Sequence, residues 1–204
     1  MKPSEYVKNV LITESCDFPA IKGRIDDKMI RLLHAGLGLS SELSELSLAH
    51  PLSFSGNTDW VNIAEECGDL TWYAAIAVNV LGFDHEEISL PESQIHNSGL
   101  KLHSTYSFED CLLTAVYSIG EYNDLLKKHL FYGKEFDTQR IKFKLQQLCM
   151  AIAGLCFVAG TTIEEVRQTN INKLRARYGE KFTEAAALNR DLETERKILE
   201  EGKS

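Results

Sequence analysis

Two pairs of acidic residues stand at helical spacing in the first half of the chain. Glu42 and Glu45 are separated by two residues, and Glu66 and Asp69 repeat that spacing after twenty intervening residues. Side chains three residues apart share one face of a helix. One such pair is typical of a solvated helix surface, but two pairs with the same phase favour a common site. Because carboxylate oxygens without His or Cys suit a hard cation, the pattern predicts a Mg²⁺ site that could also take Mn²⁺.

The acids border an apolar stripe in each of two predicted helices, 27–49 and 59–81. A short connecting loop favours an antiparallel hairpin, and face-to-face packing of the stripes then brings both acid pairs to one side. Carboxylates held so close repel one another as they lose solvent, so protons or cations must lie between them. Glu65 is ambiguous, because it could be a fifth ligand, a base acting through water or an exposed side chain.

The elements that position these acids are predicted to be helices throughout, so the fold class is all-α. The chain has only four prolines, and its long apolar patterns follow a helical period rather than strand alternation. The predicted helices span 4–13, 27–49, 59–81, 107–130, 136–159, 162–177 and 184–201. The segment 84–107 lacks an apolar period and is expected to be a linker that could begin with a short helical turn.

The second half of the chain resembles the first. At an offset of 79 residues Glu121 aligns with Glu42 and Asp124 with Glu45. We interpret this as a duplicated hairpin, giving tandem hairpins that form a four-helix-bundle core with extra N- and C-terminal helices. Chance alignment of helical periods is the alternative. The expected single domain, 1–204, comprises repeat one (28–88), a linker (89–107), repeat two (108–166) and C-terminal helices (167–204).

Repeat two lacks the second acid pair. Where repeat one has Glu66 and Asp69, repeat two has Lys144 and Gln147. We therefore expect no metal in repeat two, and we expect Lys144 to pair with Glu121 in place of a cation.

Composition limits the classes of partner and compartment. The net charge of −8 argues against a protein that coats nucleic acid or an anionic membrane, since either needs a basic face. No stretch reaches the ~20 apolar residues that span a bilayer, and no signal peptide is expected. The five cysteines are scattered without metal-ligand spacing, so we expect reduced thiols, mostly in the core, in the cytoplasm, or in the host cytoplasm if the protein is phage-encoded.

At the acidic motifs the sequence resembles the MazG-like nucleotide pyrophosphohydrolases of the all-α NTP pyrophosphatase superfamily, whose signature is ExxE, a spacer and ExxD. Similar stretches are LLHAGLGLSSELSEL, NIAEECGDLTWYAAIAVNVLG and TNINKLRARYGEKFTEAAALNRDLETERKILE. The resemblance implies Mg²⁺-dependent hydrolysis of (deoxy)nucleoside triphosphates to monophosphate and pyrophosphate. It makes Glu42, Glu45, Glu66 and Asp69 the metal ligands, with Glu45 or Glu66 helping to activate water.

Substrate contacts are expected from basic and aromatic residues in the second half and from Trp72. The family's KKHLFYGK-like segment occurs only in repeat two, whereas repeat one has AHPLSFSGN, so the two functions are expected to be divided between the halves. The candidates are Trp72, Lys127, Lys128, Tyr132, Lys134, Asn170, Lys173 and Arg177.

Two other functions stay open, a nucleotide-binding or regulatory module with little turnover and an assembly role for the charged C-terminal helix. Pairing into a homodimer is likewise open.

Overall fold

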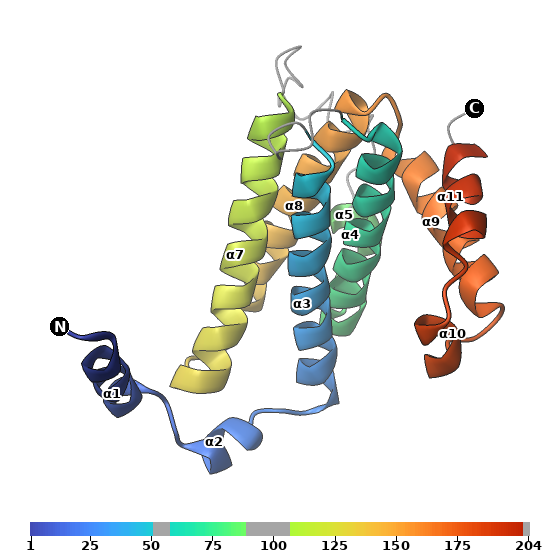
Figure 1. Cartoon of the computed structure of the whole chain (residues 1–204). Coiled ribbons are helices and arrows are strands. Elements are labelled where there is room, and N and C mark those ends of the chain that lie inside the picture. The colour runs from blue at the N-terminus through green and yellow to red at the C-terminus, as the bar shows by residue number, and fades with distance from the viewer. Residues whose placement is uncertain (51–57, 89–106, 202–204) are drawn as a thin grey trace.

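The computed structural model describes residues 1–50, 58–88 and 107–201. Every regular element in these ranges is a helix, which confirms the all-α class (Figure 1). Most of the predicted linker, residues 89–106, lies outside the described residues. Its expected first helical turn is α5, His85–Ile88.

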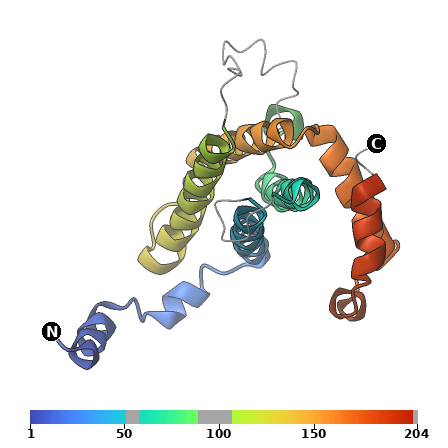
Figure 2. The same ribbon diagram turned by 45° about the horizontal axis from the view of Figure 1, so that its top comes forward.

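Four long antiparallel helices form the body of the molecule. They are α3 (Asp27–Leu48), α4 (Trp60–Leu81), α7 (Phe108–Tyr132) and α8 (Thr138–Val158). The hairpin α3–α4 packs beside the hairpin α7–α8, with α3 against α7 and α4 against α8 (Figures 1 and 2). Their apolar stripes meet in one continuous core. The antiparallel α3–α4 hairpin is the arrangement that the acid phases required.

Small residues let the helices approach closely. A Cβ at Gly38 of α3 would lie 2.2 Å from the ring of Tyr73 on α4, and one at Gly36 would lie 2.3 Å from Oδ1 of Asn123 on α7. The buried hydroxyl of Tyr122 donates to a carbonyl of α3 at 2.9 Å. These contacts fix α3 between its two neighbours, and α3 carries half of the predicted acids.

The C-terminal residues form a second layer on α4. Helix α9 (Ile163–Tyr178) packs on α4, and α11 (Leu192–Glu201) returns along α9 (Figure 2). The prediction of one helix over 184–201 is wrong, because α10 ends at Leu188 and the chain turns before α11. Asp191 accepts a hydrogen bond from the backbone N–H of Thr194, which starts the new helix.

Helix α8 is both long and apolar. By length and apolarity alone Thr138–Val158 could cross a membrane, although 56% of its most apolar window is buried in the bundle. The short N-terminal helices differ from it. Helix α1 (Pro3–Thr13) has no buried residue and stands away from the bundle, joined to it through α2 (Phe18–Lys22), a helix that the pattern did not predict (Figure 1).

Candidate metal centre

Three carboxyl groups from the first hairpin converge on one point. One oxygen from each of Glu42, Glu45 and Glu66 lies within 4.8 Å of the other two. Glu45 is exposed, Glu42 is half-buried and Glu66 is only 3% exposed. The acidic trio, as we call these three residues, joins both predicted acid pairs across α3 and α4. Three carboxylate oxygens this close together could serve as ligands of a hard cation.

The surroundings of Glu66 disfavour the charged form of its carboxyl group. Burial, a proton shared with Glu42 and the neighbouring negative charges raise the pKa of Glu66 to about 9. Burial also raises the pKa of Glu42. Within the described part of the chain, Oε2 of Glu66 is buried without a hydrogen-bond partner. A buried carboxyl oxygen of this kind is costly unless something else satisfies it, and a bound cation would do so.

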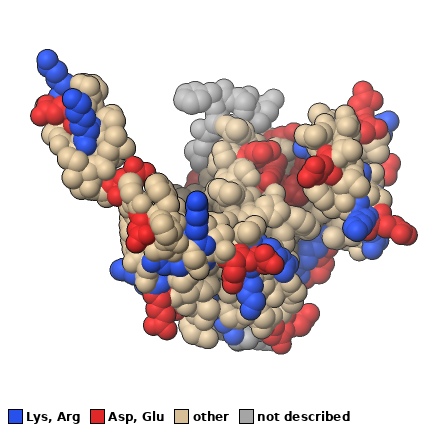
Figure 3. Space-filling view, turned by 90° about the horizontal axis from the view of Figure 1, so that it is seen from below, with Lys and Arg blue, Asp and Glu red and all other residues tan. Residues whose placement is uncertain are grey.

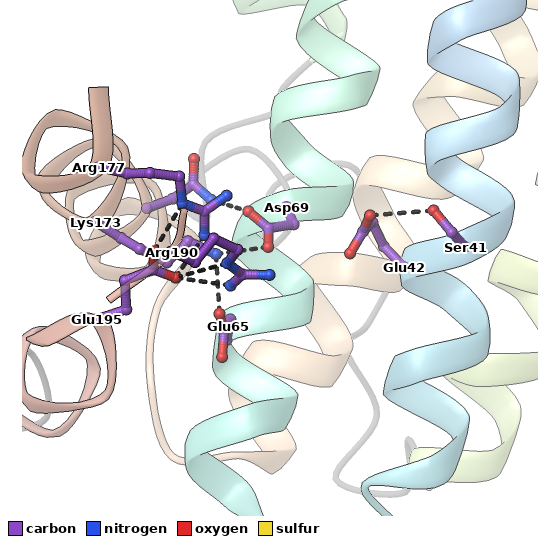
Figure 4. A network of polar contacts seen from close by, with 9 residues as sticks. Ser41, Glu42, Glu65, Asp69, Lys173, Arg177, Arg190 and Glu195 are labelled. Atoms are coloured by element: carbon purple, nitrogen blue, oxygen red, sulfur yellow. Dashed lines mark hydrogen bonds and ion pairs between the residues drawn. The ribbon is translucent and has the colours of Figure 1, made fainter. Parts of the chain in front are cut away.

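The fourth predicted ligand, Asp69, is not among the three converging acids, and its carboxylate faces α9 rather than Glu42 (Figure 4). It accepts hydrogen bonds from the amide of Asn170 and, at 2.6 Å, from Nζ of Lys173. The same ammonium lies 3.0 Å from Oε1 of Glu65. Burial alone would lower the pKa of Lys173, which is 1% exposed, but its two carboxylate partners outweigh burial and raise it. Glu65 is therefore held in an ion pair rather than exposed.

Helix α9 reaches Asp69 because Gly68 has no side chain. A Cβ at Gly68 would lie 3.0 Å from both the Cβ of Asn170 and the carbonyl oxygen of Val166. The close packing of α9 on α4 puts Asn170 and Lys173 beside Asp69. The glycine inside the second acidic motif thus has a geometric role.

A cleft of about 1260 Å³ opens between the acids and the C-terminal layer. Ligand pockets typically measure ~300–1,000 Å³, so a nucleotide would fit. The trio and Asp69 line one wall, and the opposite wall carries Arg175, Arg177, Tyr178, Lys181, Phe182 and Arg190. Seen from below, acidic side chains lie between the bundle and the C-terminal helices, and this face carries both signs of charge rather than one basic patch (Figure 3).

Aromatic side chains form a further part of the cleft wall. The ring of Tyr73 makes edge contacts with Trp72 at 4.9 Å and with His34 at 5.4 Å between centroids. All three residues line the cleft. Trp72 was predicted as a substrate contact, whereas His34 and Tyr73 were not.

Two arginines on the far wall share one buried carboxylate. Arg177, a predicted substrate contact, donates from Nε to Oε1 of Glu195 at 2.8 Å, and Arg190 donates from Nη2 to Oε2 at 2.7 Å. Arg190 and Glu195 were not predicted as site residues, because both were expected to lie on one charged helix, 184–201. The signal that could have found them is Asp191, whose capping role breaks that helix and turns Arg190 back toward the cleft.

The basic segment of repeat two does not reach the acids in this structure. Lys127 and Lys128 both form ion pairs with Asp124 of their own helix. Tyr132 and Lys134 are exposed at the far end of α7. None of the four predicted contacts lines the cleft.

In repeat two, the charged side chains at the positions equivalent to the acidic pairs have other partners than expected. Glu121 accepts from Arg140, so the predicted pair between Glu121 and Lys144 is wrong. Lys144 is 5% exposed, donates to Gln147 at 2.9 Å and lies 4.2 Å from the ring centroid of Tyr117. Arg140 lies in the first turn of α8, one turn before Lys144, and it supplies the opposite charge.

Comparison of the chain with protein-family models, curated proteins and solved structures gave no match.

Proposed function

We propose that the chain is a MazG-like nucleoside triphosphate pyrophosphohydrolase. It would hydrolyse (deoxy)nucleoside triphosphates between the α and β phosphates, giving the monophosphate and pyrophosphate. The observation that carries the proposal is the acidic trio at the edge of a nucleotide-sized cleft, with Oε2 of Glu66 buried and without a protein partner in the described residues.

The trio fits a divalent cation. Glu42, Glu45 and Glu66 would hold Mg²⁺ through carboxylate oxygens, because the cation would meet the unpartnered oxygen of Glu66 and offset the repulsion that keeps that residue protonated. When bound, Mg²⁺ would neutralise phosphate charge and lower the pKa of the attacking water.

The side chains around the cleft supply the other needs of the reaction. Arg175 and Arg177 stand on the wall opposite the acids, where guanidinium groups can meet the non-bridging phosphate oxygens. Trp72 offers an aromatic surface for the base. Glu45 is the exposed member of the trio, and we assign it the role of accepting the proton of the attacking water.

The test is pyrophosphate release by the purified full chain from the common ribo- and deoxyribonucleoside triphosphates with Mg²⁺. Replacing Glu45 by Gln keeps the size of the side chain and removes its charge, so we expect release to fall by roughly 10²–10⁴-fold. The matched control is Glu193→Gln, which removes an exposed carboxylate from α11. Undiminished release by Glu45→Gln would reject the proposed role of the trio.

One observation favours a second candidate, a nucleotide-binding module with little turnover. Asp69 is engaged by Lys173 and Asn170 instead of facing the trio. If these contacts persist with ligand, the trio binds metal and nucleotide without completing the reaction. This candidate predicts tight nucleotide binding without pyrophosphate release, and it predicts that Asp69→Asn changes neither.

The compartment belongs to the proposal as well. Cys67, Cys111, Cys149 and Cys156 are buried free thiols and Cys16 is an exposed one. We propose the cytoplasm, where thiols stay reduced.

A further inference from the structure

The carboxylate of Glu195 is buried between two guanidinium groups of the cleft wall. It is 4% exposed. Arg177 donates to it from Nε and Nη2. Arg190 also donates from its own Nε and Nη2, at 3.3 Å and 2.7 Å (Figure 4). One carboxylate therefore holds two arginines side by side, although they come from α9 and from the turn before α11.

Arg190 keeps donors that this carboxylate does not use. A guanidinium has five N–H donors, and in the described structure every hydrogen bond of Arg190 goes from Nε or Nη2 to Glu195. The Arg190 side chain is 42% exposed and lines the cleft. Its Nη1 edge is therefore open to a ligand while the opposite edge is fixed.

The charge at this point differs from that around Lys173. Lys173 is surrounded by two carboxylates, so that group is negative overall. Arg177 and Arg190 share one carboxylate, so their group is positive overall. Of these two fixed groups, only the arginine pair offers an anion net positive charge, and it stands on the wall opposite the acidic trio.

We propose that Arg177 and Arg190 form a two-guanidinium subsite for the polyphosphate chain of the ligand, and that Glu195 is the positioning residue that holds them together. Paired guanidinium donors match the oxygens of phosphoryl groups in geometry and charge. Arg190 is thus a binding residue supplied by the C-terminal turn. The subsite rests on the proposed function for its ligand class, but binding can be measured without turnover.

The experiment is calorimetric titration of inorganic tripolyphosphate with Mg²⁺ into the full chain and its variants. Arg190→Gln removes a charge-assisted contact from an exposed turn, so we expect affinity to fall at least about tenfold. The matched control is Arg196→Gln on α11. It breaks ion pairs with Asp59, the N-cap of α4, and with Glu200, and it is expected to leave affinity unchanged. Equal affinity of Arg190→Gln and the unmodified chain overturns the subsite.

Glu195→Gln separates positioning from simple electrostatics. The substitution removes a negative charge near the anion, so electrostatics alone predicts tighter binding. If Glu195 positions the two arginines, the variant should bind tripolyphosphate more weakly, because the arginines lose their shared partner. Tighter binding by Glu195→Gln would show that the carboxylate competes with the ligand, and it would overturn the positioning role. If this variant does not fold, Arg190→Gln still decides the subsite.

The outcomes also separate this subsite from the proposed function. Tripolyphosphate binding that depends on Arg190, in a chain that releases no pyrophosphate from any nucleotide, supports the subsite and rejects the function. Pyrophosphate release with the same KM in Arg190→Gln and the unmodified chain supports the function and rejects the subsite. When both hold, Arg190→Gln raises KM with little change in kcat, because the contact serves binding.

Discussion

Replacing Glu66 by Gln should stabilise the metal-free protein. The pKa of Glu66 rises from 4.5 for a free carboxyl to about 9 in the fold. Between these values the unfolded chain releases the proton while the folded chain keeps it. Folding stability is therefore lost as pH rises from 4.5 toward 9, by about 1.4 kcal/mol per pH unit. At pH 7 this amounts to about 3 kcal/mol, and Gln avoids it because its amide is neutral at every pH.

The assay is thermal and urea unfolding in EDTA at pH 5, 7 and 9. A gain of about 3 kcal/mol at pH 7 corresponds to roughly 6–12 °C in Tm for a chain of this size. The advantage of Glu66→Gln should be small at pH 5 and largest at pH 9. Glu45→Gln is the control, since Glu45 belongs to the same trio but is exposed, and its removal should change metal-free stability little.

With Mg²⁺ bound, the unmodified chain should be more stable than Glu66→Gln. A ligand that binds only the folded state adds about 4.1 kcal/mol at a concentration of about 1,000 times its Kd. This gain exceeds the advantage of about 3 kcal/mol that Glu66→Gln has at pH 7 in EDTA, and Glu66→Gln should lose it. Equal stability of the unmodified chain and Glu66→Gln from pH 5 to pH 9 in EDTA would refute the electrostatic account of the trio.

Three further substitutions test the packing around the site, each by urea unfolding. Lys173→Met leaves two partly buried carboxylates without their cation and should cost about 3–5 kcal/mol, whereas a cost below 1 kcal/mol would mean that the ion pairs are weak. Tyr122→Phe removes a buried hydroxyl whose hydrogen bond is worth about 1 kcal/mol, and an unchanged midpoint would count against that bond. Gly38→Ala places a methyl group 2.2 Å from the Tyr73 ring and should cost about 1–3 kcal/mol. Its control, Gly120→Ala, meets no atom within 4 Å and should stabilise the helix by about 0.5–1 kcal/mol; destabilisation by both would show that the ring contact is not the cause.

The bundle and the trio could be predicted because both depend on helical periodicity. Leu39 and Leu46 of α3 are fully buried, as their stripe required, and the acids of the same turns border the core. Phase then fixed which side of the hairpin the carboxyl groups share. These are local properties of each helix, and they need no knowledge of distant residues.

The environment of Asp69 could not be predicted, because it depends on how α9 crosses α4. That crossing follows from Gly68, whose contact with Asn170 joins residues 102 positions apart in the sequence. The role of Arg190 was missed for a related reason. A charged stretch of helical period predicts one exposed helix, whereas a single capping residue, Asp191, turns the chain and changes what that stretch faces.

The most direct measurement is ³¹P NMR of the full chain with Mg²⁺ and a hydrolysable nucleoside triphosphate in ¹⁸O-labelled water. The account predicts nucleoside monophosphate and pyrophosphate as the products, complete loss of turnover with EDTA and no turnover by Glu66→Gln. Nucleoside diphosphate with inorganic phosphate, or turnover that survives EDTA, would contradict a metal-dependent pyrophosphohydrolase centred on Glu42, Glu45 and Glu66.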